Sequence, residues 1–255
     1  MPPRTAPSEP AALPRLTLSL SLVCALGAPA LAWAQSPPNP ADLAPGSTYR
    51  LMFVTSGTTQ GKSSSIGTYN ALATTDGNQY YNGTTWSAVV STTGVNAIDN
   101  IACTPSCAGD PIYLVNGAKV ANSTTSLFGG SILTPIDVTQ ADLPSAASFF
   151  NKVWTGSTTG GVKNGVFGLG YSYQTLQSSH LTTLHKAEAG KATASAAPWI
   201  AFAATIGSQS LPIYAISGEL TAAAAVPEPA ALGLLALGAV GLGAVRRRRL
   251  RLPAA

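Results

Sequence analysis

Two histidines and a pair of aspartates are the side chains of this chain best suited to acid–base or metal chemistry. His180 and His185 lie five residues apart, whereas two zinc ligands on one helix face are typically about four residues apart in His-Glu-x-x-His, a motif that the sequence lacks. We interpret both histidines as solvent-facing residues of a polar segment. Asp137 and Asp142 stand in a turn-like context and are interpreted as loop or capping residues.

These observations predict no catalytic residue, no cofactor-binding residue and no metal ligand. We therefore expect a protein that is not an enzyme. A secreted hydrolase with an unrecognised active site is the alternative, and convergent Asp or His side chains in a pocket would favour it.

Aromatic residues beside turns are the one sequence feature that points to ligand binding. Tyr80 and Tyr81 flank a predicted turn together with Trp86, and Tyr171 and Tyr173 alternate near another turn. Aromatic rings stack on sugar faces, and a tyrosine also offers a polar edge. The two tyrosine pairs are therefore candidate ligand contacts, with packing in the core as the alternative.

Two cysteines in the middle of the chain, Cys103 and Cys107, form the sequence Cys-Thr-Pro-Ser-Cys. In an exported protein this pair predicts a structural disulfide. A redox pair and half of a metal site are the alternatives, but redox motifs usually have two intervening residues, and a metal needs further ligands.

The segment TYRLMFVT is the first predicted strand. Tyr49, Leu51 and Phe53 alternate onto one face, while Met52 and Val54 occupy the other. Because both faces are apolar, we expect this strand to be central in its sheet.

Helix and turn signals complete the expected domain. Apolar residues at helical spacing predict a helix over 63–74, and Asp76-Gly77 and Asn82-Gly83 mark turns. The sequence predicts an α+β domain over 48–220, with a mixed, mostly antiparallel sheet and one or two helices. Further strands are expected at 85–90, 111–115, 119–120, 152–155, 198–206 and 211–220, and a second helix, stopped by Gly190, at 176–189.

The N-terminal segment has the pattern of a secretory signal. An apolar run at 16–31 precedes Ala32-Trp33-Ala34, and the two alanines fit the small-residue positions of a signal peptidase site. The sequence thus predicts a signal peptide over 1–34, cleaved before Gln35, and a Pro-rich linker over 35–47. Between residues 36 and 225, seven basic residues (Arg50 and six lysines) stand against eight acidic ones, a net charge of −1, although the whole chain carries +4. This balance of charges gives no indication of the clustered Lys and Arg residues that nucleic-acid binding requires.

The C-terminal segment, 221–251, has three parts. The motif at 226–229 contains Pro227, Glu228 and Pro229, an uncharged apolar run follows at 230–245, and a basic stop at 246–251 closes the segment. Sixteen helical residues span roughly 24 Å, so 230–245 is predicted as a short transmembrane helix with snorkelling arginines. The basic stop begins with Arg246, Arg247, Arg248 and Arg249, which predicts a cytoplasmic C-terminus.

This three-part tail resembles the PEP-CTERM sorting signal of bacterial surface proteins. The resemblance implies an exported chain that is held briefly in the membrane, is cut near Pro-Glu-Pro by an exosortase, and ends at the cell surface or in the extracellular matrix of an exopolysaccharide-producing cell. Signal peptidase, an exosortase-type membrane enzyme and exopolysaccharide are the implied partners. An ordinary C-terminal membrane anchor is the alternative.

A second resemblance rests on the segments 86–90, 110–117, 127–130 and 152–157. Their order resembles the central part of the endostatin domain, a C-type-lectin-like α+β fold, with coverage over about 48–220. The long-range disulfides, the basic heparin-binding surface and the calcium-dependent sugar motifs of those families are absent from this sequence. The resemblance therefore implies the fold but identifies no ligand. We expect a binding or structural role.

Overall fold

The computed structural model describes residues 36–102, 108–145, 151–177 and 180–224. The predicted signal peptide with Ala32 and Ala34, the Cys103–Cys107 pair and the sorting tail from residue 225 onward lie outside the described residues. Within those residues, no helix is long and apolar enough to span a bilayer. The predicted span at 230–245 falls outside them.

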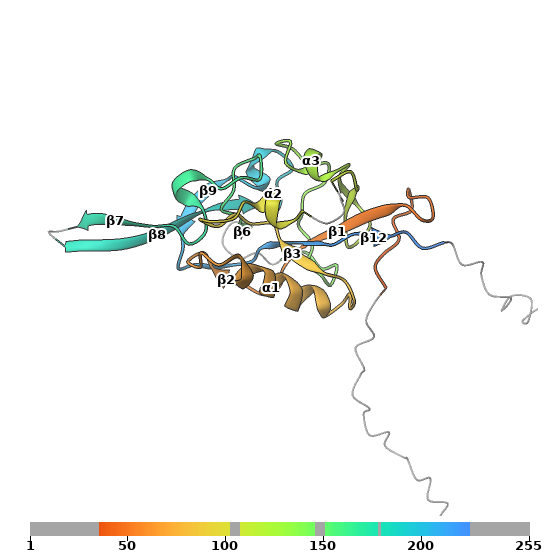
Figure 1. The fold of residues 1–255 in the computed structure, drawn as a ribbon, viewed down its shortest axis with the longest axis horizontal. Helices are drawn as coiled ribbons and strands as arrows, with labels where there is room; N and C mark the ends of the chain where they lie inside the picture. Colours follow the sequence, from red (N-terminus) through yellow and green to blue (C-terminus); the bar gives the residue numbers. More distant parts are fainter. Residues whose placement is uncertain (1–35, 103–107, 146–150, 178–179, 225–255) are drawn as a thin grey trace, which may run out of the picture. The chain divides into compact units, whose positions relative to one another are not determined.

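The described residues form an α+β fold with three sheets (Figure 1). The helices are α1 (Ile66–Asn78), α2 (Ala97–Asn100) and α3 (Thr124–Leu127), with 3-10 turns η1 (Gly165–Phe167) and η2 (Ala197–Trp199). The strands are β1 (Thr48–Val54), β2 (Thr59–Gln60), β3 (Trp86–Ala88), β4 (Ile112–Leu114), β5 (Lys119–Ala121), β6 (Lys152–Trp154), β7 (Ser172–Gln177), β8 (His180–Lys191), β9 (Ala203–Ile206), β10 (Ser210–Leu211), β11 (Tyr214–Ser217) and β12 (Leu220–Thr221).

Strand β1 is central, as its apolar pattern predicted. The main sheet has the order β3-β11-β1-β4-β5, in which β1 runs parallel to β4 and antiparallel to β11. Leu51 and Phe53 pack in one buried cluster, and Met52 and Val54 pack in a second cluster. The expectation of a mixed, mostly antiparallel sheet is confirmed, because β1–β4 is the one parallel pair between the named strands of the described residues.

Helix α1 covers the Leu51 and Phe53 face of the main sheet. Its residues Tyr69 and Ala73 are fully buried in the same cluster, and α1 lies along β3 in Figure 1. The helix was predicted over 63–74, with a turn at Asp76-Gly77. Instead α1 continues through both residues and buries them, because the Asp76 carboxylate accepts backbone and side-chain hydrogen bonds from the segment after β1.

Strand β8 corrects the prediction of a helix over 176–189. Residues 180–185 of β8 pair antiparallel with β7, Lys186–Ala189 pair with β9, and Ala189–Lys191 pair with β6. Gly190 lies inside the strand rather than ending a helix, because a Cβ there would stand 2.1 Å from the carbonyl oxygen of Trp199. The close approach of two backbones therefore explains this glycine.

The predicted linker is attached to the domain over its second half. Gly46 N donates to Ala222 O at 2.9 Å, and Ala222 N donates to Ser47 O at 2.8 Å. An ion pair joins Lys119 Nζ to Asp42 Oδ2 at 2.7 Å. The two ends of the described body therefore leave side by side, at the start of β1.

Candidate functional site

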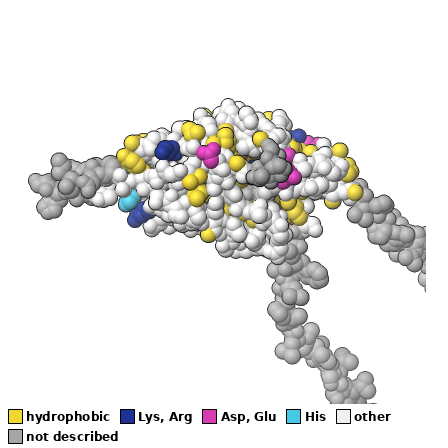
Figure 2. Space-filling model, viewed as in Figure 1, with side chains coloured by type: hydrophobic (Ala, Val, Ile, Leu, Met, Phe, Trp, Pro, Cys, Tyr) yellow, Lys and Arg dark blue, Asp and Glu magenta, His cyan; other side chains and the backbone are white. Residues whose placement is uncertain are grey.

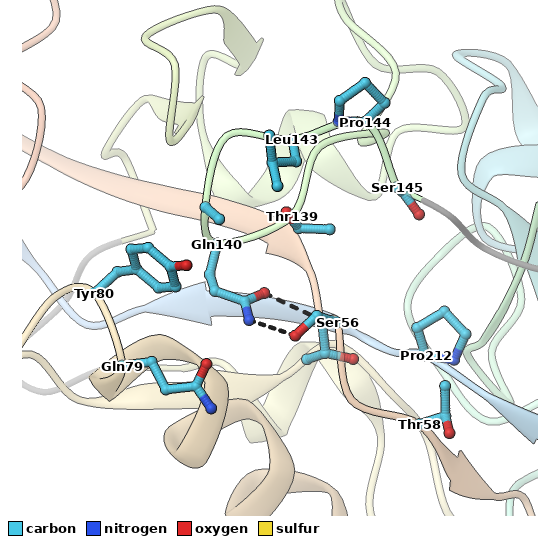
Figure 3. Close-up of a pocket in the computed structure, with 12 residues that line it drawn as sticks. Ser56, Thr58, Gln79, Tyr80, Thr139, Gln140, Leu143, Pro144, Ser145 and Pro212 are labelled. Carbon is cyan, nitrogen blue, oxygen red and sulfur yellow. Dashed lines mark hydrogen bonds between the residues drawn. The ribbon is translucent and has the colours of Figure 1, made fainter. Parts of the chain in front are cut away.

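A pocket of about 330 Å³ opens where β1 ends. Seven of its twelve lining residues are Ser, Thr or Gln and one is Tyr, but apolar atoms make up most of the exposed surface of the wall (Figure 3). Its lining residues are Thr55, Ser56, Thr58, Gln79, Tyr80, Thr139, Gln140, Ala141, Leu143, Pro144, Ser145 and Pro212. None of these is an Asp, Glu, His, Lys or Arg.

Three chain segments meet at this pocket because the backbone ties them together. Val54 N, at the end of β1, donates to Val138 O at 2.8 Å, which holds the loop 138–145 against the strand. The loop turns back on itself through Thr139 N to Leu143 O at 2.8 Å. Asp142 adopts a left-handed conformation with φ of 55° at this turn, a conformation that Asp tolerates better than most residues. The C-terminal end of α1 supplies the opposite wall.

A side-chain network fixes the floor of the pocket. Gln140 Nε2 donates to Ser56 Oγ at 2.6 Å, and Ser56 N donates to Gln140 Oε1 at 3.2 Å. Behind them, Asp76 Oδ2 accepts from Gly57 N at 2.8 Å and from Ser56 Oγ at 3.3 Å. Gln140 and Asp76 are both buried. This network holds Ser56 in one position before any ligand arrives.

Tyr80 is the one predicted ligand-contact tyrosine that lines this pocket. It is half-buried, and Figure 3 shows its ring beside Gln140. Its neighbour Tyr81 is a core residue instead. Tyr81 is 3% exposed, its ring lies 6.1 Å from that of Trp86, and burial raises the pKa of Tyr81 to about 12.

The second predicted pair lies elsewhere. Tyr171 is half-buried beside a hollow that Val166, Phe167 and Lys186 also line. Tyr173 belongs to β7, and its side chain lies outside the described part of the chain. Tyr171 therefore does not line the pocket at the end of β1.

The residues considered for acid–base chemistry are dispersed. His185 is half-buried on β8, and the side chain of His180 is not among those described. Asp137 O accepts from Ser145 N at 2.6 Å, so this residue helps to close the 138–145 loop. Within the described ranges, no three His, Cys, Asp or Glu side chains gather closely enough to hold a metal ion.

Sequence reasoning missed most of the pocket. Ser56 and Gln140 form hydrogen bonds although they are 84 positions apart in the chain. No motif in the sequence indicates that they come together. Asp76 was interpreted as a turn residue, although its carboxylate supports the pocket from behind. Only the Tyr80 ring gave a usable signal.

The chemistry of the pocket suits a neutral ligand that has both polar groups and an apolar face. Ser, Thr and Gln side chains offer both donors and acceptors, and the Tyr80 ring offers a flat apolar surface. Figure 2 shows that charged side chains are few and scattered over the displayed face. An ionic ligand would find no counter-charge in the lining.

Comparison with known proteins identifies the C-terminal segment. Residues 225–249 match the family described as the PEP-CTERM protein-sorting motif. No curated protein matches the chain. The motif match covers the predicted Pro-Glu-Pro and arginine residues, and such a signal implies export with transient anchoring in the membrane before processing. The chain therefore carries a PEP-CTERM sorting tail and is an exported protein targeted to an exosortase.

Proposed function

We propose that the exported body is a non-enzymatic binding protein that takes a neutral polysaccharide segment into the pocket between Ser56, Tyr80 and Gln140. The observation that supports this proposal is the uncharged lining, which combines a mostly apolar surface and a tyrosine ring with a hydroxyl and an amide held together by a hydrogen bond. Sugar rings present hydroxyls at their edges and an apolar face, so they match both kinds of surface.

The expected export and processing of the chain indicate where the body would meet such a ligand. Signal peptidase would remove residues 1–34, and an exosortase would cut near Pro227–Pro229, releasing the body to the cell surface or the extracellular matrix. Exopolysaccharide is the abundant ligand in that setting. We further propose a lectin-like topology for the body and a Cys103–Cys107 disulfide.

Processing is tested by intact-mass analysis of the protein recovered from outside the producing cells. We expect a chain that begins at Gln35, lacks the arginine stop, and weighs two hydrogens less than the reduced form. The matched control replaces Pro227, Glu228 and Pro229 by alanine, and this variant should remain uncut in the membrane fraction. A secreted wild-type chain that keeps residues 230–255 would contradict exosortase processing.

Ligand binding is tested by titrating the processed protein with fragments of the cells' own neutral exopolysaccharide. Tyr80→Ala should weaken binding by about 2–12-fold, the equivalent of 0.5–1.5 kcal/mol for one ring contact. Tyr80→Phe should keep most of the affinity, because the ring remains. Tyr171→Ala is the matched control and should bind as the wild type does.

Three outcomes would overturn the proposed ligand class. One is wild-type protein that binds none of the neutral fragments, and another is Tyr80→Ala with unchanged affinity. A third is preference for acidic polysaccharide, which the uncharged lining gives no reason to expect. New reducing ends during incubation would favour the hydrolase instead, whatever the effect of Tyr80→Ala.

A further inference from the structure

We propose that the two-stranded ribbon formed by β7 and β8 is a docking element, through which a second copy of this chain pairs edge to edge. The ribbon spans six antiparallel residue pairs, from Ser172↔His185 to Gln177↔His180. This proposal concerns a surface separate from the pocket and holds whether or not the pocket binds a sugar.

The outer half of the ribbon has open edges. Strand β8 gains partners β9 and β6 only from Lys186 onward. Among the described strands, residues 180–185 pair with β7 alone, and β7 pairs with β8 alone. Gly207 N donates to His185 O at 2.8 Å, so the outer edge of β8 is open over 180–184. Figure 1 shows the two strands side by side with no other labelled element along their outer part. Each edge therefore presents a row of backbone donors and acceptors to a further strand.

The sequence of the ribbon lacks the usual protection of an exposed edge. Natural proteins discourage edge pairing with charged residues, especially lysine, and with proline. Here no charged residue occurs between Lys163 and Lys186, and no proline occurs between Pro144 and Pro198. An isolated two-stranded ribbon is marginally stable in water, so an added strand would stabilise it.

Exposed apolar side chains lie at the root of the ribbon. Val166 and Ile206 are 50% and 55% exposed. Ile206 lies opposite Lys186 in the β8–β9 register, and Lys186 lines the same hollow as Val166 and Tyr171. A partner paired with the ribbon edge would also reach these side chains and remove apolar surface from water.

A second copy is the occupant that these features favour. The β7 edge carries no charge, so two identical edges meet without repulsion, and antiparallel pairing of one edge with itself satisfies a two-fold axis. In the proposed register the axis passes through Thr175, which pairs with Thr182 near the middle of the ribbon, so residue 175 of one copy pairs with residue 175 of the other. A charge introduced there would face its own symmetry mate.

The test is sedimentation velocity on processed protein over a concentration series. We expect wild-type dimers, and Thr175→Lys or Thr175→Glu should each raise the dimer dissociation constant by roughly fivefold or more, because like charges face each other across the pair. An equimolar mixture of the two variants should restore association. Thr125→Lys, which adds the same charge at an exposed position of α3, should leave association unchanged.

Amide hydrogen exchange of the wild type provides a measurement that needs no variant. Protection within 172–177 and 180–185 should fall as the protein is diluted. A protein that is monomeric at all concentrations, or dimers that persist unchanged in both Thr175 variants, would overturn the proposal. Exchange in the ribbon that is independent of concentration would do the same.

Discussion

Strands β1 and β8 are the two long strands around which the sheets are arranged, and they differ in what surrounds them. β1 has a strand on each side and a buried cluster on each face. β8 has further strand partners only in its inner half, where β9 pairs with Lys186–Ala189 and β6 pairs with Ala189–Lys191. Its outer half is paired with β7 alone. We therefore expect the stability of each strand segment to depend on packing on both faces and pairing on both edges rather than on strand length.

The largest expected effect comes from truncating the β1 core. Phe53 is fully buried, and its ring packs edge-on against Trp86 with centroids 4.9 Å apart. Phe53→Ala should lower the free energy of unfolding by about 3–5 kcal/mol, through lost burial and the cavity left behind. Urea unfolding followed by tryptophan fluorescence measures this change.

The matched variant on the outer half of β8 is Thr183→Ala, at an exposed position. It should change stability by no more than about 0.5 kcal/mol. Similar decreases in the free energy of unfolding for Phe53→Ala and Thr183→Ala would contradict the expected difference between β1 and the outer half of β8.

The next largest effect is expected where the inner half of β8 is most crowded. Gly190→Ala places a Cβ 2.1 Å from the Trp199 carbonyl oxygen, a backbone atom that cannot rotate away. We expect a loss of about 1–3 kcal/mol from overpacking. Gly94→Ala, where no atom lies within 4 Å of the added Cβ, is the control for thermal unfolding. Equal melting temperatures for the two variants would mean that β8 and η2 are not closely packed.

A smaller effect is expected at α3, which lies against the edge strand β5 of the main sheet. Ser123 Oγ accepts from Ser126 N at 3.0 Å, and Ser126 Oγ accepts from Ser123 N at 2.8 Å, forming a capping box. Ser123→Ala should therefore cost about 1 kcal/mol. Thr125→Ala in the same helix should cost less, and chemical denaturation of both variants measures the difference. A larger loss for Thr125→Ala would show that the cap is unimportant.

The smallest effect is a pH dependence on the inner half of β8. Burial raises the pKa of the Glu188 carboxyl, although a hydrogen bond from Asn164 partly opposes this shift. The native state thus keeps the proton to higher pH than the unfolded chain does. Protonated Glu188 therefore contributes its full stabilisation at pH values below the pKa of the unfolded chain. This stabilisation is lost as the pH rises through the higher pKa of the native state.

Glu188→Gln removes this titration and tests the assignment. The stability of the variant relative to the wild type should increase between about pH 3 and about pH 7, as measured by urea unfolding at each pH. A difference that stays constant, or that shrinks as pH rises, would show that the native pKa is not raised.

Features with a local signal could be predicted from the sequence. The apolar residues on both faces of β1 marked it as central, and the turn at Asn82-Gly83 forms with Gly83 at φ of 83°. Trp86, which was placed beside the same turn as Tyr80 and Tyr81, is a core residue with 4% of its surface exposed. The sorting tail was also recognisable, because its three parts are consecutive in the chain.

Features that depend on distant partners were missed. Leucine, glutamine, lysine, glutamate and alanine favour a helix over 176–189, but pairing with β6, β7 and β9 determines the strand instead. The pocket depends on a hydrogen-bonded contact between Ser56 and Gln140 that only the folded topology creates. A glycine beside a distant carbonyl, such as Gly190, likewise has no local signal.

The antiparallel contact of β1 with β12 separates the chain ends of the body from the pocket. Thr48 and Tyr49 pair with Thr221 and Leu220 where the chain enters and leaves the body, whereas the pocket lined by Ser56 and Gln140 follows the opposite end of the same strand. Seven strand residues separate these ends by about 20 Å. If the pocket binds sugar as proposed, a tail not yet cut by the exosortase would leave it open to polymer.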